Sequence, residues 1–380
     1  MARGAPNKVR PPGPPALRSK PADPPGILMR MPLFLQIWGI FSASMFVPAA
    51  YALVRDNHPH SQSFFYSGLL GLVIVTLIAL ALAARPPRFG AAGQLLALLG
   101  TFALLPLFLA VPLHDALRTT SFFNAYFDMV SAITTTGADI FADPRRLEPP
   151  LHLWRAQVAW MGGLVMWIAA SAILAPMSLG GFEITARGQP GRGVVAPQPG
   201  DRTDRRRRLW IVARTLTPIY AGLTGVVWVL LLVAGETGLT ALVHAMSVMS
   251  TSGISPVGGV HHGQAGLGGE VVLFLFMAFA LSRLTFSSDT ATSGHGRLDR
   301  DPEFRIGLLL VLGVPLLMFL RHWSGAYDVD AGDNLDQALR AFWGSMFTVM
   351  SYVSTTGFLS TEWDTAQHWS GLGTPGLILM

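Results

Sequence analysis

The sequence contains no cysteine and few charged residues, and each scarcity excludes a class of protein. Without a thiol the chain has neither disulfides nor thiolate metal sites, so nothing indicates redox chemistry or an oxidising compartment. Only 13% of the residues are charged, whereas 51% are hydrophobic and the mean hydropathy is +0.44. This balance is too apolar for an ordinary soluble domain and predicts an all-α integral membrane protein.

Long hydrophobic runs recur along the 380 residues. A spanning helix needs roughly 20 apolar residues to cross about 30 Å of hydrocarbon. Seven stretches meet that length: 33–54, 62–83, 93–114, 154–175, 211–233, 266–285 and 306–322. An eighth begins at Gly373. The first 32 residues are rich in Pro, Arg and Lys and lack the apolar core of a signal peptide, so we expect a disordered cytoplasmic tail.

Positive charge is distributed unevenly between the two sides of these spans. With the N-terminus inside, 20 of the 27 Lys and Arg residues fall in the tail and in the loops 84–92, 176–214 and 282–305. Cytoplasmic loops carry such an excess, so we expect a multi-pass protein with a cytoplasmic N-terminus. Arg205–Arg208 is a basic run beside a span, for which lipid headgroups are a better partner than nucleic acid.

Three similar sequences interrupt apolar helical patterns with a glycine. They read SAITTTGADIF at 131–141, SVMSTSGISPV at 247–257 and MSYVSTTGFLST at 350–361. Their glycines, Gly137, Gly253 and Gly357, are 116 and 104 residues apart. Such spacing predicts a repeated module of span, short helix, break and span.

Each break follows an apolar segment between two spans, at 121–134, 240–250 and 333–353. The first has Thr119, Thr120 and Ser121 as candidate N-caps. Fourteen helical residues rise only about 21 Å, so we expect such helices to enter the membrane partway and return. The third segment is longer and by its length alone resembles a span.

Non-helical backbone at membrane depth is tolerated only where protein buries it or where it lines a watery cavity. Glycine can take a positive φ, which lets successive carbonyls point into a narrow passage and replace the water around a cation. A single Thr-Thr-Gly is usually a helix C-cap, but threefold repetition favours a pore. We therefore predict three ion-binding filter segments, with flanking hydroxyls adding oxygens. They consist of Thr135, Thr136 and Gly137, of Thr251, Ser252 and Gly253, and of Thr355, Thr356 and Gly357.

Asp128 lies within the first short helix, where an ionisable side chain is costly and usually functional. It serves either as a structural and electrostatic support behind the filter or as a proton relay. The spans hold no paired carboxylates, Ser-His pair or His-Glu motif, so a cation conduit is favoured over a proton-coupled carrier or a membrane-embedded enzyme. His261-His262 and Gly294-His295-Gly296 lack the neighbours of a metal or phosphate site. We expect no cofactor.

The recurring order of span, short helix, Thr-Thr-Gly and span resembles the Trk/Ktr/HKT superfamily of potassium uptake proteins, and most of all its TrkH branch. The resemblance is carried by AITTTGA at 132–138, STTGF at 354–358 and WRAQVAWMGGLV at 154–165. The second filter segment, STSGISPVGG, departs from the family's usual filter sequence. The two extra N-terminal spans fit the additional helix pair of TrkH proteins.

The resemblance implies potassium uptake across a bacterial inner membrane through helix, pore-helix, filter and helix modules arranged around a pseudo-fourfold ion pore. It also implies a homodimer on cytosolic nucleotide-binding regulatory subunits, which we place against the basic loops 176–214 and 282–305. The chain then divides into a tail (1–32), an extra helix pair (33–92), pore repeats at 93–185, 210–290 and 306–380, and connecting loops at 186–209 and 291–305.

The family has four repeats, so the resemblance implies an incomplete third repeat and no fourth. We expect residues 1–380 alone to be a truncated, non-conducting fragment, unless a second polypeptide supplies the missing quadrant. Replacing Gly137 or Gly357 by valine is expected to abolish potassium selectivity without preventing membrane insertion, because a β-branched residue resists positive φ.

Overall fold

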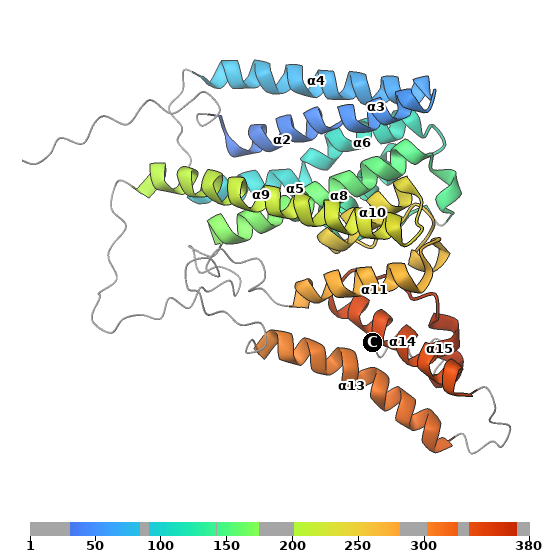
Figure 1. Cartoon of the computed structure of the whole chain (residues 1–380). Coiled ribbons are helices and arrows are strands. Elements are labelled where there is room, and N and C mark those ends of the chain that lie inside the picture. Colours follow the sequence, from blue (N-terminus) through green and yellow to red (C-terminus); the bar gives the residue numbers. More distant parts are fainter. Residues whose placement is uncertain are drawn as a thin grey trace, which may run out of the picture.

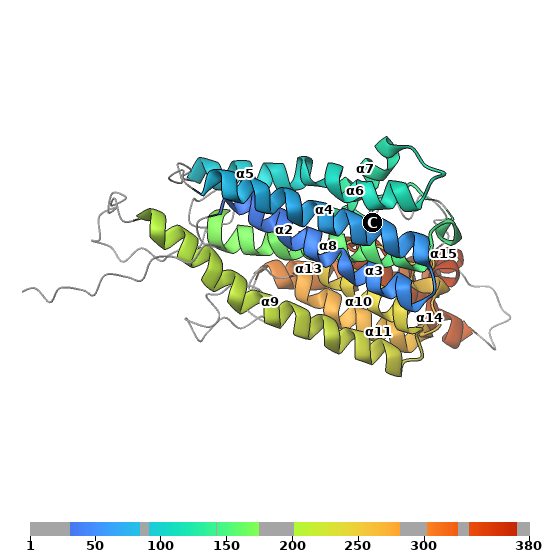
Figure 2. The same cartoon turned by 90° about the horizontal axis from the view of Figure 1, so that it is seen from above.

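The computed structural model describes residues 31–83, 91–141, 143–174, 201–281, 302–325 and 334–370. Within these ranges every regular element is a helix, which confirms the all-α membrane class (Figures 1 and 2). Several predictions fall outside the described residues: the tail as far as residue 30, Gly294-His295-Gly296, the start of an eighth span at Gly373, and most of the two basic loops.

Six helical stretches in the described part are long and apolar enough to cross a membrane. They are Leu33–Val54, His58–Leu82, Ala92–Ala116, Pro149–Leu174, Arg207–Val233 and Pro302–Leu320, and they confirm six of the seven expected spans. The stretch expected at 266–285 is described as a 12-residue helix and a four-residue 3-10 turn that ends at Leu281. This helix is shorter than the predicted span, and residues 282–285 lie outside the described part.

The spans are built from the following elements. The first comprises α2 (Leu33–Ser44) and α3 (Phe46–Val54), the second is α4 (His58–Leu82), and the third comprises α5 (Ala91–Ala103) and α6 (Leu105–Ala116). The other three spans contain α8 (Pro149–Ala169), α9 (Asp201–Val233) and α13 (Pro302–Gly325). Two shorter helices are α11 (Gly266–Met277) and α15 (Trp363–Ser370).

Several helices begin earlier than the sequence suggested, among them α8 and α9. Helix α8 starts at Pro149 instead of residue 154, because Pro149 and Pro150 occupy first-turn positions, where a missing N–H costs nothing. Helix α9 starts at Asp201, so the last residues of the connecting segment 186–209, including Arg205–Arg208, are helical. Between Asp201 and Pro218 no Gly or Pro interrupts the helix, and arginine is a good helix former.

The three short helices lie where the sequence placed them. They are α7 (Phe122–Ile133), α10 (Gly238–Ser250) and α14 (Asn334–Val353). Ser121 is the N-cap of α7, and its hydroxyl accepts a hydrogen bond of 3.2 Å from the backbone N–H of Asn124. With 12 and 13 residues, α7 and α10 rise about 18–20 Å and are too short to cross a bilayer.

Neighbouring helices pack each short helix on several sides. Helix α7 contacts α6 and α8, α10 contacts α8, α9 and α11, and α14 contacts α11, α13 and α15. Figure 1 shows α8 and α10 between the N-terminal helices α2–α4 and the C-terminal helices α11–α15. The two largest hydrophobic cores contain Trp154 of α8 and Phe347 of α14. The short helices are thereby surrounded by other helices, whereas Thr136, Thr355 and Gly357 in the breaks are exposed.

Candidate ion filter

The three short helices end with the same backbone turn. Thr135, Thr251 and Thr355 have φ angles of 55°, 51° and 60°, in the left-handed region. The next residue in each copy donates its N–H to the carbonyl five residues earlier, at 2.9, 2.9 and 2.8 Å. This is the Schellman arrangement, in which glycine usually occupies the left-handed position. A threonine there costs about 1–2 kcal/mol, so the surrounding structure must hold it in place.

The filter glycines make a second left-handed turn two residues after the threonines. Gly137, Gly253 and Gly357 have φ angles of 68°, 66° and 81°, as the sequence predicted. Each helix ends before its glycine, at Ile133, Ser250 and Val353, close to the ends expected at residues 134, 250 and 353. Thr-x-Gly therefore encodes two sharp bends with one residue between them.

The hydroxyl group before each glycine is turned back to the end of its own helix. Thr136 Oγ1 lies 2.8 Å from Thr134 Oγ1, Ser252 Oγ lies 3.0 Å from Ser250 Oγ, and Thr356 Oγ1 lies 2.9 Å from Ser354 Oγ. Each hydroxyl thus has a partner on the protein, but its oxygen keeps a lone pair that a cation can use. The expectation that these hydroxyls add oxygens to the passage beside the backbone carbonyls therefore stays a prediction.

The three filter segments lie side by side in chain order. A Cβ atom built on Gly137 would come closer than 3.0 Å to the carbonyl oxygen of Ser252, and one on Gly253 would do the same to that of Thr356. The hydroxyls of Thr251 and Thr355 are 3.4 Å apart. One filter backbone can approach the next this closely only because glycine has no side chain. The structure thus brings together all three predicted segments.

Helix α8 provides close backing for two of these segments. A Cβ on Gly162 would collide with the carbonyl of Ile133, the last residue of α7, and one on Gly163 would meet Ser250 Cβ at 3.2 Å. The Gly-Gly pair of WRAQVAWMGGLV therefore permits contact between a spanning helix and two short helices. Close packing of this kind fixes the first and second breaks relative to each other.

A serine that the sequence reasoning overlooked supports each break. Ser131, Ser247 and Ser351 are buried and lie six residues before the three glycines. Ser131 Oγ donates to the carbonyl of Ala138 at 3.0 Å, and Ser351 Oγ accepts from the N–H of Phe358 at 2.6 Å. Ser247 Oγ lies 3.3 Å from Ser252 Oγ. The signal was present in the sequence, because a serine recurs at one fixed offset in all three copies.

The acid that the sequence singled out, Asp128, forms a buried ion pair. Its side chain is 1% exposed, and it accepts hydrogen bonds of 2.9 and 2.8 Å from Nε and Nη2 of Arg155, which is 3% exposed. Arg155 Nη2 also donates to Asp139 Oδ1 at 3.0 Å, two residues beyond Gly137. The guanidinium thus joins α7, α8 and the segment after the first filter. This geometry favours structural support for Asp128 over a proton relay.

Glu270 of α11 holds the segment after the third filter. It is fully buried, and its carboxylate accepts from Trp343 Nε1 at 2.8 Å and from Ser360 Oγ at 2.7 Å. The backbone N–H and the hydroxyl of Thr361 donate to its other oxygen. A buried carboxylate needs such donors to offset lost hydration. Glu270 therefore joins the second module to the third.

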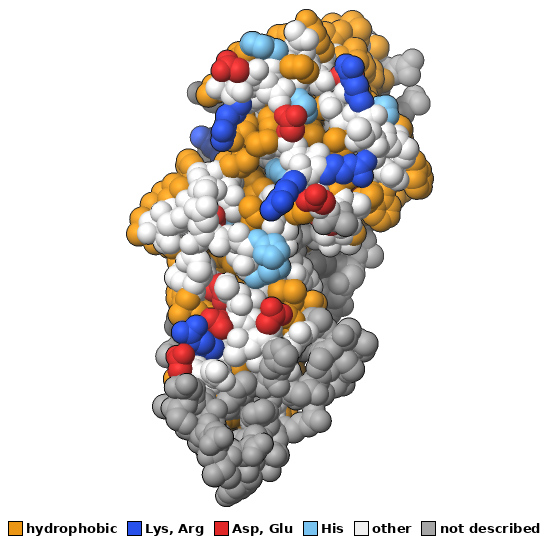
Figure 3. Space-filling view, turned by 90° about the vertical axis from the view of Figure 1, so that its right-hand side faces the viewer, with side chains coloured by type: hydrophobic (Ala, Val, Ile, Leu, Met, Phe, Trp, Pro, Cys, Tyr) orange, Lys and Arg blue, Asp and Glu red, His pale blue; other side chains and the backbone are white. Residues whose placement is uncertain are grey.

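The end of the molecule where α3 meets α4 carries charged and histidine side chains, with hydrophobic side chains at the periphery (Figure 3). His261 lies in the 3-10 turn Val260–His262 after the second filter, outside the spans. Burial, and to a lesser extent the neighbouring His262, lower the pKa of His261 below its usual 6.5. Among the described residues no three His, Cys, Asp or Glu side chains are grouped to hold a metal ion.

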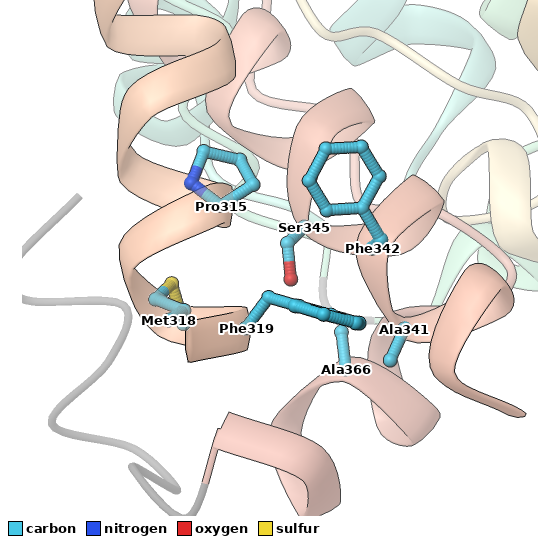
Figure 4. Close-up of a pocket in the computed structure, with 7 residues that line it drawn as sticks. All are labelled: Pro315, Met318, Phe319, Ala341, Phe342, Ser345 and Ala366. Carbon is cyan, nitrogen blue, oxygen red and sulfur yellow. The ribbon is translucent and has the colours of Figure 1, made fainter. Parts of the chain in front are cut away.

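A pocket in the third module lies apart from the filter segments. It lies between α13, α14 and α15, where Phe319 faces Phe342 around the hydroxyl of Ser345 (Figure 4). The lining residues are Pro315, Met318, Phe319, Ala341, Phe342, Ser345 and Ala366. This lining offers one hydroxyl and no charged side chain, so it does not provide the oxygen ligands that a cation requires.

Comparison with known proteins shows clear relatives, although no protein-family model matches the chain. The chain is 28% identical over 342 residues to the Trk system potassium uptake protein TrkI of Halomonas elongata, covering 86% of this chain and 63% of TrkI. It is 26% identical over 351 residues to TrkH of Escherichia coli K12, covering 90% of this chain and 67% of that TrkH. The crystal structure of the potassium transporter TrkH from Vibrio parahaemolyticus matches with a TM-score of 0.66 and 21% identity, over 85% of this chain and 64% of that chain.

The spanning helices and the three adjoining filter segments define a multi-pass membrane protein built from repeated pore modules. The TrkH structure shows the same fold. The chain is similar in sequence to the TrkH-like proteins of the Trk family, as the sequence resemblance indicated. It spans 63% of the length of TrkI and 64% of the solved TrkH chain, less than two thirds of each.

Proposed function

We propose that this chain takes part in potassium uptake across a bacterial membrane as a pore-forming subunit. The observation that carries the proposal is the contact between the three filter segments, in which the carbonyls of Ser252 and Thr356 adjoin Gly137 and Gly253. Carbonyl oxygens in such an arrangement can replace the hydration shell of a cation. The three short helices also direct the negative ends of their dipoles towards the breaks. Potassium is the cargo of this pathway, and no resident cofactor is part of the proposal.

The nine residues of the three filter segments form the proposed ion site. Their carbonyls are the main proposed ligands, and the hydroxyls before the glycines, which also bond to the helix ends, are proposed to add further oxygens. The relatives are named potassium uptake proteins, which supports a conduit over a carrier or an enzyme. The ion pair of Asp128 with Arg155 supports the same choice, since Arg155 already binds that carboxylate.

We also propose the finer features that the resemblance implied: a cytoplasmic N-terminus, a homodimer, and cytosolic nucleotide-binding regulatory subunits. The excess of Lys and Arg in loops on one side supports the orientation. The partners follow from the family alone. A pull-down of the regulatory subunit by the intact chain, and its loss when the basic loops are shortened, tests the contact.

The proposed function is tested by potassium flux into proteoliposomes that contain the chain joined to the part of TrkI that it does not match. The chain without the added part is measured alongside. Potassium entry through the joined chain above that of protein-free liposomes, and greater than sodium entry under the same gradient, is the expected result. A matched control is the Gly225→Ala variant of the joined chain, because a Cβ on Gly225 of α9 meets nothing within 4 Å. Equal entry of potassium and sodium through the joined chain, or entry no faster than in empty liposomes, would contradict the proposal.

A further inference from the structure

A buried polar residue occupies the same position in each short helix, nine residues before the filter glycine. The three residues are Asp128, His244 and Thr348, and their exposures are 1%, 1% and 0%. They precede Gly137, Gly253 and Gly357 by the same interval, although their chemistry differs. A buried polar side chain is costly unless it is hydrogen-bonded, so the partners of these residues indicate what each does.

In the first two modules this residue is linked to the second residue after the glycine. Asp128 reaches Asp139 through Arg155, whose Nη2 atom bonds to both carboxylates at 2.8 and 3.0 Å. His244 reaches Ser255 directly, with 2.8 Å between Nε2 and Oγ. An ion pair in one module and a neutral hydrogen bond in the next therefore make the same connection between the short helix and the segment beyond the filter.

The third module lacks this connection. The Thr348 hydroxyl is buried without a hydrogen-bond partner among the described residues, and the second residue after Gly357 is Leu359. Glu270 instead holds the next two residues, Ser360 and Thr361, from helix α11. Thr348 is therefore a matched position at which the link is absent.

His244 is placed to act on two filters at once. Ser255 Oγ, which His244 binds, also accepts from the backbone N–H of Val257 at 3.3 Å, so the bond extends into the backbone after the second filter. The imidazole also packs edge-on against Phe358, the residue after Gly357, with ring centroids 5.5 Å apart. The second filter in turn adjoins both neighbouring filters. A displacement of the backbone after Gly253 would thus also displace the first and third filter segments.

We propose that His244 is the positioning residue of the second filter, fixing the segment after Gly253 through Ser255 and bracing the third filter through Phe358. The inference rests on the proposed function for its link to ion selectivity, but not for the positioning itself. This positioning role depends on the hydrogen bond of His244. Thr348, at the equivalent position of the third module, makes no such bond, so we assign it no positioning role.

The test compares His244→Leu with His244→Gln, which can place an amide near the Nε2 position, and with Thr348→Val as the matched control. Hydrogen exchange of the four backbone N–H groups in residues 254–258, where residue 256 is a proline without an N–H, is measured on the purified full chain. In His244→Leu we expect exchange about tenfold faster, because Ser255 loses a buried partner. His244→Gln should restore most of the protection, and Thr348→Val should leave the amides after Gly357 unchanged.

The potassium-to-sodium flux ratio of the same variants is measured in proteoliposomes. The ratio should fall about tenfold in His244→Leu, because the loss of one buried hydrogen bond displaces the filter backbone. It should recover in His244→Gln and stay unchanged in Thr348→Val. Unaltered exchange at residues 254–258 in His244→Leu would overturn the positioning role. Faster exchange with an unaltered flux ratio would overturn its link to selectivity. If the chain joined to the unmatched part of TrkI moved no potassium while the exchange results held, the proposed function would fail and the positioning role would stand.

Discussion

Replacing Gly137 by alanine should disturb the filter more than the same change at Gly357, although both glycines have positive φ. At Gly137 a Cβ would lie 3.0 Å from the carbonyl carbon of Ser252 and closer still to its oxygen, whereas ordinary contact begins at 3.4 Å. Even the farther atom must therefore retreat by 0.4 Å. At Gly357 a Cβ meets nothing within 4 Å. Comparing Gly137→Ala with Gly357→Ala thus separates the effect of steric displacement from that of backbone strain.

The expected magnitudes follow from these two contributions. A left-handed alanine costs about 1–2 kcal/mol, which applies to both variants. Overpacking against a fixed neighbour adds about 1–3 kcal/mol, and this applies to Gly137→Ala alone. The combined cost of about 2–5 kcal/mol exceeds the roughly 1.4 kcal/mol that corresponds to a tenfold change in an equilibrium. We therefore expect Gly137→Ala to lose at least about tenfold in potassium-to-sodium discrimination, and Gly357→Ala to lose less.

The assay is the ratio of potassium to sodium flux in proteoliposomes, with the amount of inserted protein measured for each variant. Gly225→Ala is the control for an added methyl group without strain or collision, because its site on helix α9 is open. Discrimination unchanged in Gly137→Ala, or equal losses in Gly137→Ala and Gly357→Ala, would refute the argument from the contact between the first and second filters.

Three further changes probe the supports of the filters. Arg155→Leu should destabilise the chain by about 3–5 kcal/mol, because Asp128 remains buried without its partner. Thermal unfolding in detergent measures this loss, and the stability should recover when Asp128→Leu is added. Glu270→Leu should cost about 3 kcal/mol or more by leaving several buried donors unpaired, whereas Glu270→Gln keeps an acceptor and should unfold closer to the unmodified chain. For His261, whose pKa is lowered by burial, the unfolded chain takes up a proton more readily as the pH falls below 6.5. Stability should therefore decline on acidification through that range, and this part of the decline should disappear in His261→Asn melting curves.

Much of the architecture was predictable because it depends on local sequence patterns. Apolar runs of spanning length placed six helices, and the Gly-containing repeat placed the three short helices and their breaks. Ser121 was among the expected caps, because capping depends on residues three positions apart. The same local reasoning missed the left-handed threonines such as Thr135, since propensity assigns that conformation to glycine.

The partners of the buried polar residues were decided only by the tertiary structure. Asp128 was visible as a candidate support, but its pairing with Arg155 required α7 and α8 to cross at one particular register. Likewise, Glu270 meets Ser360 across 90 residues of chain, a contact that no spacing rule predicts. The sequence by itself determined where the helices run and break, because those features follow from hydrophobic length and residue conformation. The packing of distant helices decided which breaks adjoin and which charges hold them, because such contacts depend on helix crossings that no local pattern encodes.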